Sequence, residues 1–190
     1  PASRKPPSLQ THPPKSRLLA EYGGDLAAFI ETFVPLKAYP YIPDVARLER
    51  LWLDSYHELD APVLDGAELA ALPPEELFAT RFLAHPATRL LASNYSAVTI
   101  MSANRAEGEV PPIDPSKPEF GLVTRPHLAV DVRLISAASL LFFTRLIAGS
   151  TLAQAAEAAL AGDAGFDLPG NLQGMLTAGI FTSVKPNDQE

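Results

Sequence analysis

The chain has 190 residues, enough for one domain of ordinary size or two small ones. Because 47% of the residues are hydrophobic and 19% are charged, it can bury a core and is not an intrinsically disordered chain. The sequence contains no cysteine, which excludes disulfides, thiolate zinc sites, iron–sulfur clusters and cysteine nucleophiles. This composition fits a cytoplasmic protein.

Charge is distributed unevenly. The formal net charge is −7, from 15 basic and 22 acidic residues. Four of the basic residues and none of the acidic ones lie in residues 1–20, so the rest carries twice as many acids as bases. Such a body is a poor general binder of phosphate backbones, which require clustered Lys and Arg. The most apolar run, residues 134–148, is shorter than the ~20 residues of a membrane span, and no apolar stretch marks a secretory signal.

The first half of the chain is predicted to be mostly helical. Residues 1–16 contain five prolines and are expected to form an extended arm outside the core. A short helix is expected after Gly24 and Asp25. A long amphipathic helix is expected after an N-cap at Asp44, where apolar residues recur at spacings of three and four. This half is completed by a short helix at 67–72, a helical turn at 73–77, short segments of strand or irregular character at 81–83 and 88–91, and a helix at 93–104.

The second half predicts a hairpin followed by helices. Residues 120–125 and 128–135 suit strands, because apolar residues in the second alternate with period two, and Pro126 and His127 supply the turn. Three helices then follow, capped at Ser136 and Thr151 and ended by glycines, before a last short strand. The stretch 105–119 has four prolines and no periodicity, so it predicts a linker.

We therefore predict an α+β, mainly helical protein. Its N-terminal helical part is followed by a winged-helix-like domain, a β-hairpin plus three helices. The predicted organisation is an arm (1–16), a helical domain (17–104), a linker (105–119), the winged-helix-like domain (120–184) and a tail (185–190).

No combination of residues in the sequence indicates a catalytic site or a metal site. The four histidines, His12, His57, His85 and His127, show no i+3 or i+4 pairing. Neither a G-x-S-x-G elbow nor a glycine-rich phosphate loop is present. We predict no catalytic residue, no metal ligand and no cofactor in this chain.

Two binding functions suit a winged-helix arrangement. Residues 146–184 contain no Lys or Arg, which disfavours recognition of DNA by these helices, so a DNA-binding regulator is kept as the alternative. An edge strand at 120–125 would instead accept an extended peptide, unless the hairpin merely covers the helices. The expected peptide-binding residues are Phe120, Leu122, Thr124, Leu128, Val130 and Val132.

Four segments resemble one bacterial family. Residues 41–57 (YIPDVARLERLWLDSYH) are similar to the signature of the HvfC-type family, which is also described as DNA-binding. Residues 13–23 (PPKSRLLAEYG), 85–91 (HPATRLL) and 97–104 (AVTIMSAN) continue the resemblance in order. Family members usually carry a further helical region before the proline-rich entry, to which the DNA-binding description largely belongs. We expect that region to be missing here.

The resemblance implies an accessory role. The shortened form of the family resembles the partner subunits of iron oxidases in methanobactin-type biosynthesis. It implies a heterodimer with an iron-containing TIM-barrel oxidase that converts cysteines of a ribosomal precursor peptide into oxazolone and thioamide groups. The iron ligands would belong to the oxidase, and this non-catalytic chain would hold the leader peptide through its winged-helix-like domain.

The helical domain would then dock on the oxidase. Aromatic residues are favoured interface anchors, although core packing is the alternative for Trp52 and Tyr56. Arg125 and His127, at the predicted hairpin turn, are candidates to enter the partner's active site. The expected interface residues are Tyr39, Tyr41, Trp52, Tyr56 and His57.

Overall fold

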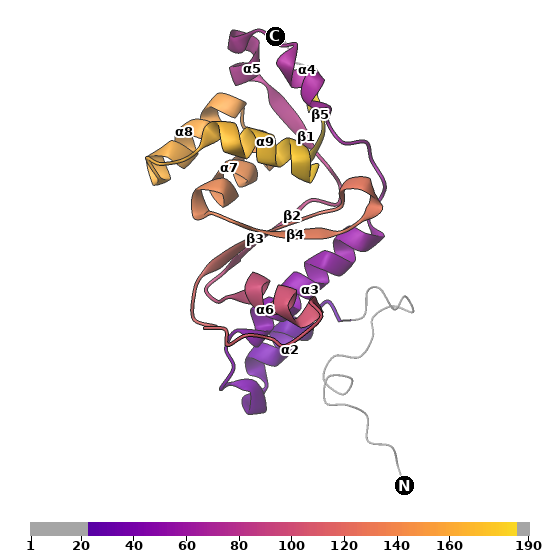
Figure 1. Cartoon of the computed structure of the whole chain (residues 1–190), viewed down its shortest axis with the longest axis vertical. Helices are drawn as coiled ribbons and strands as arrows, with labels where there is room; N and C mark the ends of the chain where they lie inside the picture. Colours follow the sequence, from indigo (N-terminus) through magenta and orange to yellow (C-terminus); the bar gives the residue numbers. More distant parts are fainter. Residues whose placement is uncertain (1–22, 186–190) are drawn as a thin grey trace.

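A computed structural model describes residues 23–185 and shows an α+β protein (Figure 1). The predicted arm at 1–16 lies outside the described residues. No helix of the described part is long and apolar enough to cross a membrane. In chain order the elements are α2 (Leu26–Thr32), η2 (Val34–Leu36), α3 (Ile42–His57), α4 (Gly66–Ala70), α5 (Pro74–Ala79), β1 (Arg81–Ala84), β2 (Arg89–Ser93), α6 (Ala97–Arg105), β3 (Glu119–Thr124), η3 (Pro126–Leu128), β4 (Asp131–Ile135), α7 (Ala137–Ile147), α8 (Leu152–Gly162), α9 (Leu168–Ala178) and β5 (Phe181–Lys185).

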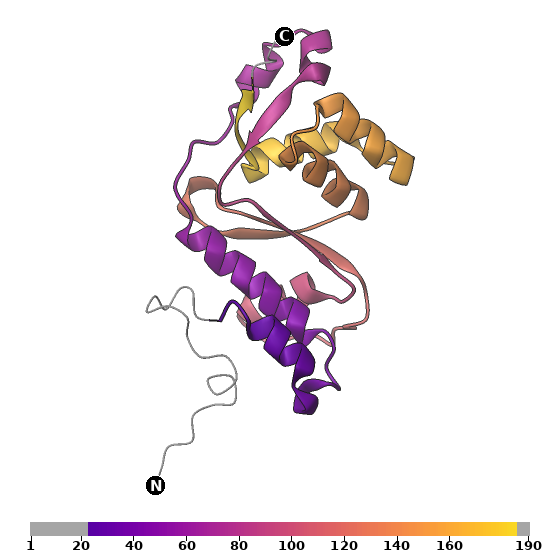
Figure 2. The same ribbon diagram turned by 180° about the vertical axis from the view of Figure 1, so that it is seen from behind.

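A three-stranded antiparallel sheet crosses the middle of the molecule, with strand order β2-β3-β4. Figure 1 shows α2, α3 and α6 on one side of this sheet and α7, α8 and α9 on the other. Seen from behind, α2 and α3 lie side by side (Figure 2). A separate two-stranded antiparallel sheet joins β1 to β5. The sheet is therefore the middle layer between two groups of helices.

The alternation of side chains along β3 divides the interior into two cores. Val123 packs with Leu48 of α3 and Met101 of α6. Its neighbour Leu122 points to the opposite face and packs with Phe142 and other residues of the C-terminal helices. On the α3 side, Gly121 permits close approach, since a Cβ atom there would lie 3.1 Å from Val98.

The boundary expected at 105–119 does not separate two cores. Strand β2 precedes this stretch and pairs along its length with β3, which follows it. The larger core likewise combines Phe82 of β1 with Phe142 and Phe181 from the C-terminal part. The stretch itself is a loop held to the fold, because the Ser96 hydroxyl donates to the Asp114 carbonyl at 2.9 Å. The loop therefore connects two strands of one sheet.

The long helix is confirmed, but its predicted N-cap is wrong. α3 begins at Ile42, with Tyr41 as N-cap, because Pro43 fits the first turn, where its missing N–H costs no hydrogen bond. Asp44 lies inside that turn, and its carboxylate accepts from the Ser93 hydroxyl at 2.6 Å. The helix predicted from residue 93 also begins later, at Ala97, because Ser93 ends β2.

The predicted caps at the starts of α7 and α8 and at the end of α9 are confirmed, whereas Gly162, expected to close the second helix, is the last residue of α8 and Asp163 is its C-cap. Ser136 accepts from the Ser139 amide, and Thr151 forms a capping box with Gln154. Gly179 ends α9 in the left-handed conformation, with φ 65°. The hairpin turn is longer than predicted: β4 begins at Asp131 instead of residue 128. The three helices and the hairpin are thus present, together with the β1–β5 pair that the predicted domain did not include.

Candidate functional site

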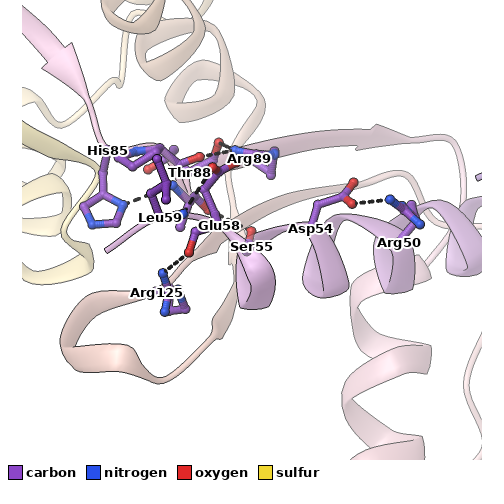
Figure 3. Close-up of polar contacts among 11 residues, drawn as sticks. Arg50, Asp54, Ser55, Glu58, Leu59, His85, Thr88, Arg89 and Arg125 are labelled. Atoms are coloured by element: carbon purple, nitrogen blue, oxygen red, sulfur yellow. Dashed lines mark hydrogen bonds and ion pairs between the residues drawn. The ribbon is translucent and has the colours of Figure 1, made fainter. Parts of the chain in front are cut away.

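A network of charged residues joins the end of α3 to the turn between β3 and β4 (Figure 3). Arg125 lies directly after β3, and its side chain is only 8% exposed. Its Nη2 atom donates to the Glu58 carbonyl at 2.6 Å and lies 2.7 Å from an oxygen of the Asp60 carboxylate. Asp60 is 68% exposed. A nearly buried cation is therefore paired with a carboxylate that is mostly in water.

The second ion pair of the network joins Glu58 to Arg89. The Arg89 Nη2 atom lies 2.7 Å from the Glu58 carboxylate. This hydrogen bond from Arg89, followed by one from the Leu59 amide, lowers the pKa of Glu58 below its ordinary value of 4.5. Arg89 also donates to the carbonyls of Pro86 and Thr88, so it holds the loop before β2 against α3.

His85 is a buried structural residue beside this network. Its Nδ1 atom accepts from the Ala87 amide at 3.1 Å, which leaves Nε2 to carry the proton and donate to the Ala61 carbonyl at 3.1 Å. Ser55 of α3 binds the same loop, because its hydroxyl donates to the Ala87 carbonyl at 2.7 Å. Both ring nitrogens of His85 are thus occupied in positioning the loops at 58–63 and 85–88.

A cavity of about 340 Å³ opens between these loops and the hairpin turn. At the turn, His127 and Leu128 both adopt left-handed backbone conformations, with φ of 53° and 67°. This conformation is rare for residues other than glycine. Both side chains are exposed. The residues that line the cavity are Asp60, Ala61, Pro62, Val63, His85, Arg125, His127 and Leu128.

The expectation of an open edge at 120–125 is wrong. β3 is the central strand, with β2 on one side and β4 on the other, so its backbone is already paired. Leu122 and Thr124 are buried, and Phe120 is half-buried. Val130 and Val132 pack against the core on the α3 side, whereas Leu128 is exposed. The outer strands are β2 and β4, and neither has a second strand partner among residues 23–185.

The predicted interface residues form two groups at opposite ends of α3. Tyr39 and Tyr41 meet edge to face at the start, with ring centroids 6.3 Å apart. At the other end, Tyr56 stacks on Trp52 at 5.4 Å and meets His57 at 5.0 Å. Trp52 packs against the core and lies under the Arg105 guanidinium, whereas Tyr56 is 52% exposed. Tyr39, Tyr56 and His57 are thus the exposed members of the set.

Within residues 23–185, no group of three or more His, Asp or Glu side chains is arranged to hold a metal ion. The fold brings His85 and His127 to the same cavity, but His57 lies at the end of α3 and outside the cavity lining. The fourth histidine of the sequence, His12, lies outside the described part.

The sequence predicted Arg125 and His127 as candidate site residues but not the residues that surround them. Glu58 and Asp60 come from one segment and His85 and Arg89 from another, and no spacing in the sequence relates the two segments to each other or to Arg125. Only their convergence in the fold shows the network. No protein-family model matches this chain, and no curated protein sequence matches it.

The Glu58–Arg89 pair predicts a pH-dependent contribution to stability. Because the folded-state pKa of Glu58 is lowered, the contribution is present above the unfolded pKa near 4.5 and is lost as the pH falls through the folded value. Glu58→Gln should cost about 1 kcal/mol or less at pH 7, since the pair is partly exposed. This difference from the parent chain should shrink below about pH 4.5.

Urea unfolding at pH 7 and at pH 3 measures both quantities. Glu49→Gln, at an exposed position of α3, the helix that Glu58 follows, is the matched control and should show no such pH-dependent difference. A cost for Glu58→Gln that is the same at both pH values would contradict the role of this pair.

Proposed function

We propose that this chain is the non-catalytic subunit of a heteromeric, iron-dependent, peptide-modifying oxidase complex. The proposed role is that of MbnC, the subunit that accompanies the TIM-barrel oxidase MbnB in methanobactin biosynthesis. The complex would act in the cytoplasm and convert cysteines of a ribosomal precursor peptide into oxazolone and thioamide groups. Iron would be held by the partner, and the present chain would bind both the oxidase and the leader peptide. The resemblance of residues 41–57 to the HvfC-type signature supports this proposal.

The observation that carries the peptide-binding part is the free edge of β4. An outer strand presents alternate N–H and C=O groups away from its partner, and an extended peptide can pair with them. On β4 the side chain of Leu134 is exposed, and Arg133 pairs with Asp131 on the same strand at 2.5 Å. The leader would therefore add as a fourth strand beside β4, in place of the contact with 120–125 expected from the sequence.

The docking part rests on the exposed aromatic residues of α3. Tyr56 and His57 end the helix, and the adjacent Leu59 is also exposed. Large exposed apolar and aromatic side chains that lie close together are typical of interfaces. We assign the oxidase contact to this end of α3. We also propose that residues 120–184 form a winged-helix-like domain. In it the hairpin would be the wing and α7–α9 the helical part.

Co-expression with an MbnB-like oxidase tests the complex directly. We expect the two chains to elute together at equal stoichiometry in size-exclusion chromatography, with iron in the complex, and mass spectrometry to show modified precursor only when both are present. Tyr56→Ala should weaken the complex about tenfold or more, as loss of an aromatic interface anchor does. The control is Phe78→Ala, which removes an exposed aromatic side chain from α5, away from the proposed contact.

Two outcomes would contradict the proposal. The first is that the chain elutes alone from cells that express the oxidase. The second is binding of duplex DNA with a steep salt dependence, which would favour the regulator considered from the sequence.

A further inference from the structure

Arg125 carries a buried charge that the protein balances only weakly. A nearly buried guanidinium requires an anionic partner, because its charge is poorly solvated. The carboxylate of Glu58 is engaged by Arg89, so the direct ion-pair partner of Arg125 is Asp60. Asp60 lies mostly in water, so a ligand carboxylate can take its place provided that Arg125 keeps an anionic partner. Any departure of Asp60 would leave Arg125 in need of another anion.

The guanidinium also has a donor that the protein does not use. Nη2 serves both the Glu58 carbonyl and Asp60, whereas Nε is buried and has no hydrogen-bond partner among the described residues. Arginine binds carboxylates best through two parallel N–H groups. Asp60 therefore makes a one-sided contact, and a two-sided one requires a turn of the Arg125 side chain that uncovers Nε. A carboxylate that bridged Nε and Nη2 would satisfy the unused donor.

The cavity beside Arg125 combines this charge with apolar walls. Pro62, Val63 and Leu128 line it together with the exposed ring of His127. The turn contains two consecutive left-handed residues, and such strain is typical of binding and catalytic sites. The nearby carboxylates of Glu58 and Asp60 would repel a doubly charged phosphate more than a singly charged group. The surroundings therefore favour a carboxylate attached to a short apolar body.

We propose that this cavity is a carboxylate-binding site in which Asp60 occupies the place of the ligand until the ligand arrives. Arg125 binds the ligand's carboxylate through two N–H groups, and Pro62, Val63 and Leu128 contact its apolar part. The carboxylate belongs either to a peptide side chain or to a free peptide C-terminus. The inference concerns this chain by itself and holds or fails independently of the oxidase complex.

Nuclear magnetic resonance of the chain alone, observing the arginine Nε–H signals, tests the site. The probes are N-acetylvaline, which has a free C-terminal carboxylate, and N-acetylglutamate α-amide, which has a side-chain carboxylate. We expect a saturable shift of the Arg125 signal with at least one of them, and the tighter probe identifies the source. The uncharged amide counterparts should bind about tenfold more weakly or worse.

Two variants separate binding from folding. Arg125→Lys keeps the charge but removes the two-sided contact, and should weaken binding about tenfold. Asp60→Asn, at an exposed position, removes the internal competitor and should tighten binding about threefold or more. It should also lower the stability of the ligand-free chain, because the Arg125 charge is then unpaired, and the ligand should restore part of this loss. The proposal is overturned if neither probe shifts the signal in the parent chain or in Asp60→Asn. It is equally overturned if Asp60→Asn fails to tighten binding, or if methylphosphonate binds as well as the carboxylates.

Discussion

Replacing Phe142 with alanine is expected to lower the free energy of unfolding by about 3–5 kcal/mol. Phe142 of α7 is 0% exposed, and its ring contacts those of Phe143 at 5.4 Å and Phe166 at 5.2 Å. Truncation removes buried apolar surface and leaves a cavity that the surrounding helices fill only in part. Urea unfolding monitored by circular dichroism measures the change.

The matched control for this prediction is Phe78→Ala. Phe78 is an exposed phenylalanine of α5, and its truncation should cost well under half as much as that of Phe142. Equal losses for the two variants would contradict the assignment of Phe142 to the centre of the larger core.

Proline substitutions along β4 should separate peptide binding from folding. Alternate residues of an outer strand point their N–H groups toward the neighbouring strand and toward solvent, so Val132 and Arg133 differ in this respect. One of Val132→Pro and Arg133→Pro should remove a bond to β3 and cost about 1–3 kcal/mol of stability. The other should leave the fold nearly intact but weaken leader binding about tenfold or more, because it removes a donor from the free edge.

Fluorescence polarisation with a labelled leader peptide and thermal unfolding measure the two effects. Val132→Ala and Arg133→Ala report what each side chain contributes without any change to the backbone donors. If the well-folded proline variant bound the leader as tightly as the parent chain, strand addition at β4 would be refuted.

The elements that follow from local chemistry could be predicted from the sequence. Ser136 and Thr151 cap α7 and α8, because their side chains accept hydrogen bonds from free backbone N–H groups of the first turn. Gly179 ends α9, because glycine readily adopts the left-handed conformation found there. The hairpin of β3 and β4 follows equally from the alternation of apolar residues around a turn. Such signals act over a few residues and do not depend on the rest of the chain.

The position of the open edge could not be predicted in this way. β2 lies before the proline-rich loop, and its pairing with β3 makes β3 the central strand and leaves β2 and β4 as the outer strands. The pairing depends on burial of both sheet faces, by α3 and α6 on one side and by α7 on the other, and no local pattern contains that information. For the same reason, the residues predicted to bind peptide include the buried Leu122 and Thr124.

The amino-acid sequence by itself accounts for the α+β composition, the helix limits in the C-terminal part, and the acidic, cysteine-free character of the chain. The fold in three dimensions accounts for the outer position of β4 and for the meeting of Arg125, Asp60 and His85 at one cavity. The difference is physical. Helix caps and the alternation of apolar residues depend on interactions between residues close together in the sequence. Strand order and a buried ion pair depend on contacts between segments many residues apart, and bringing such segments together is favourable only when the whole core is formed.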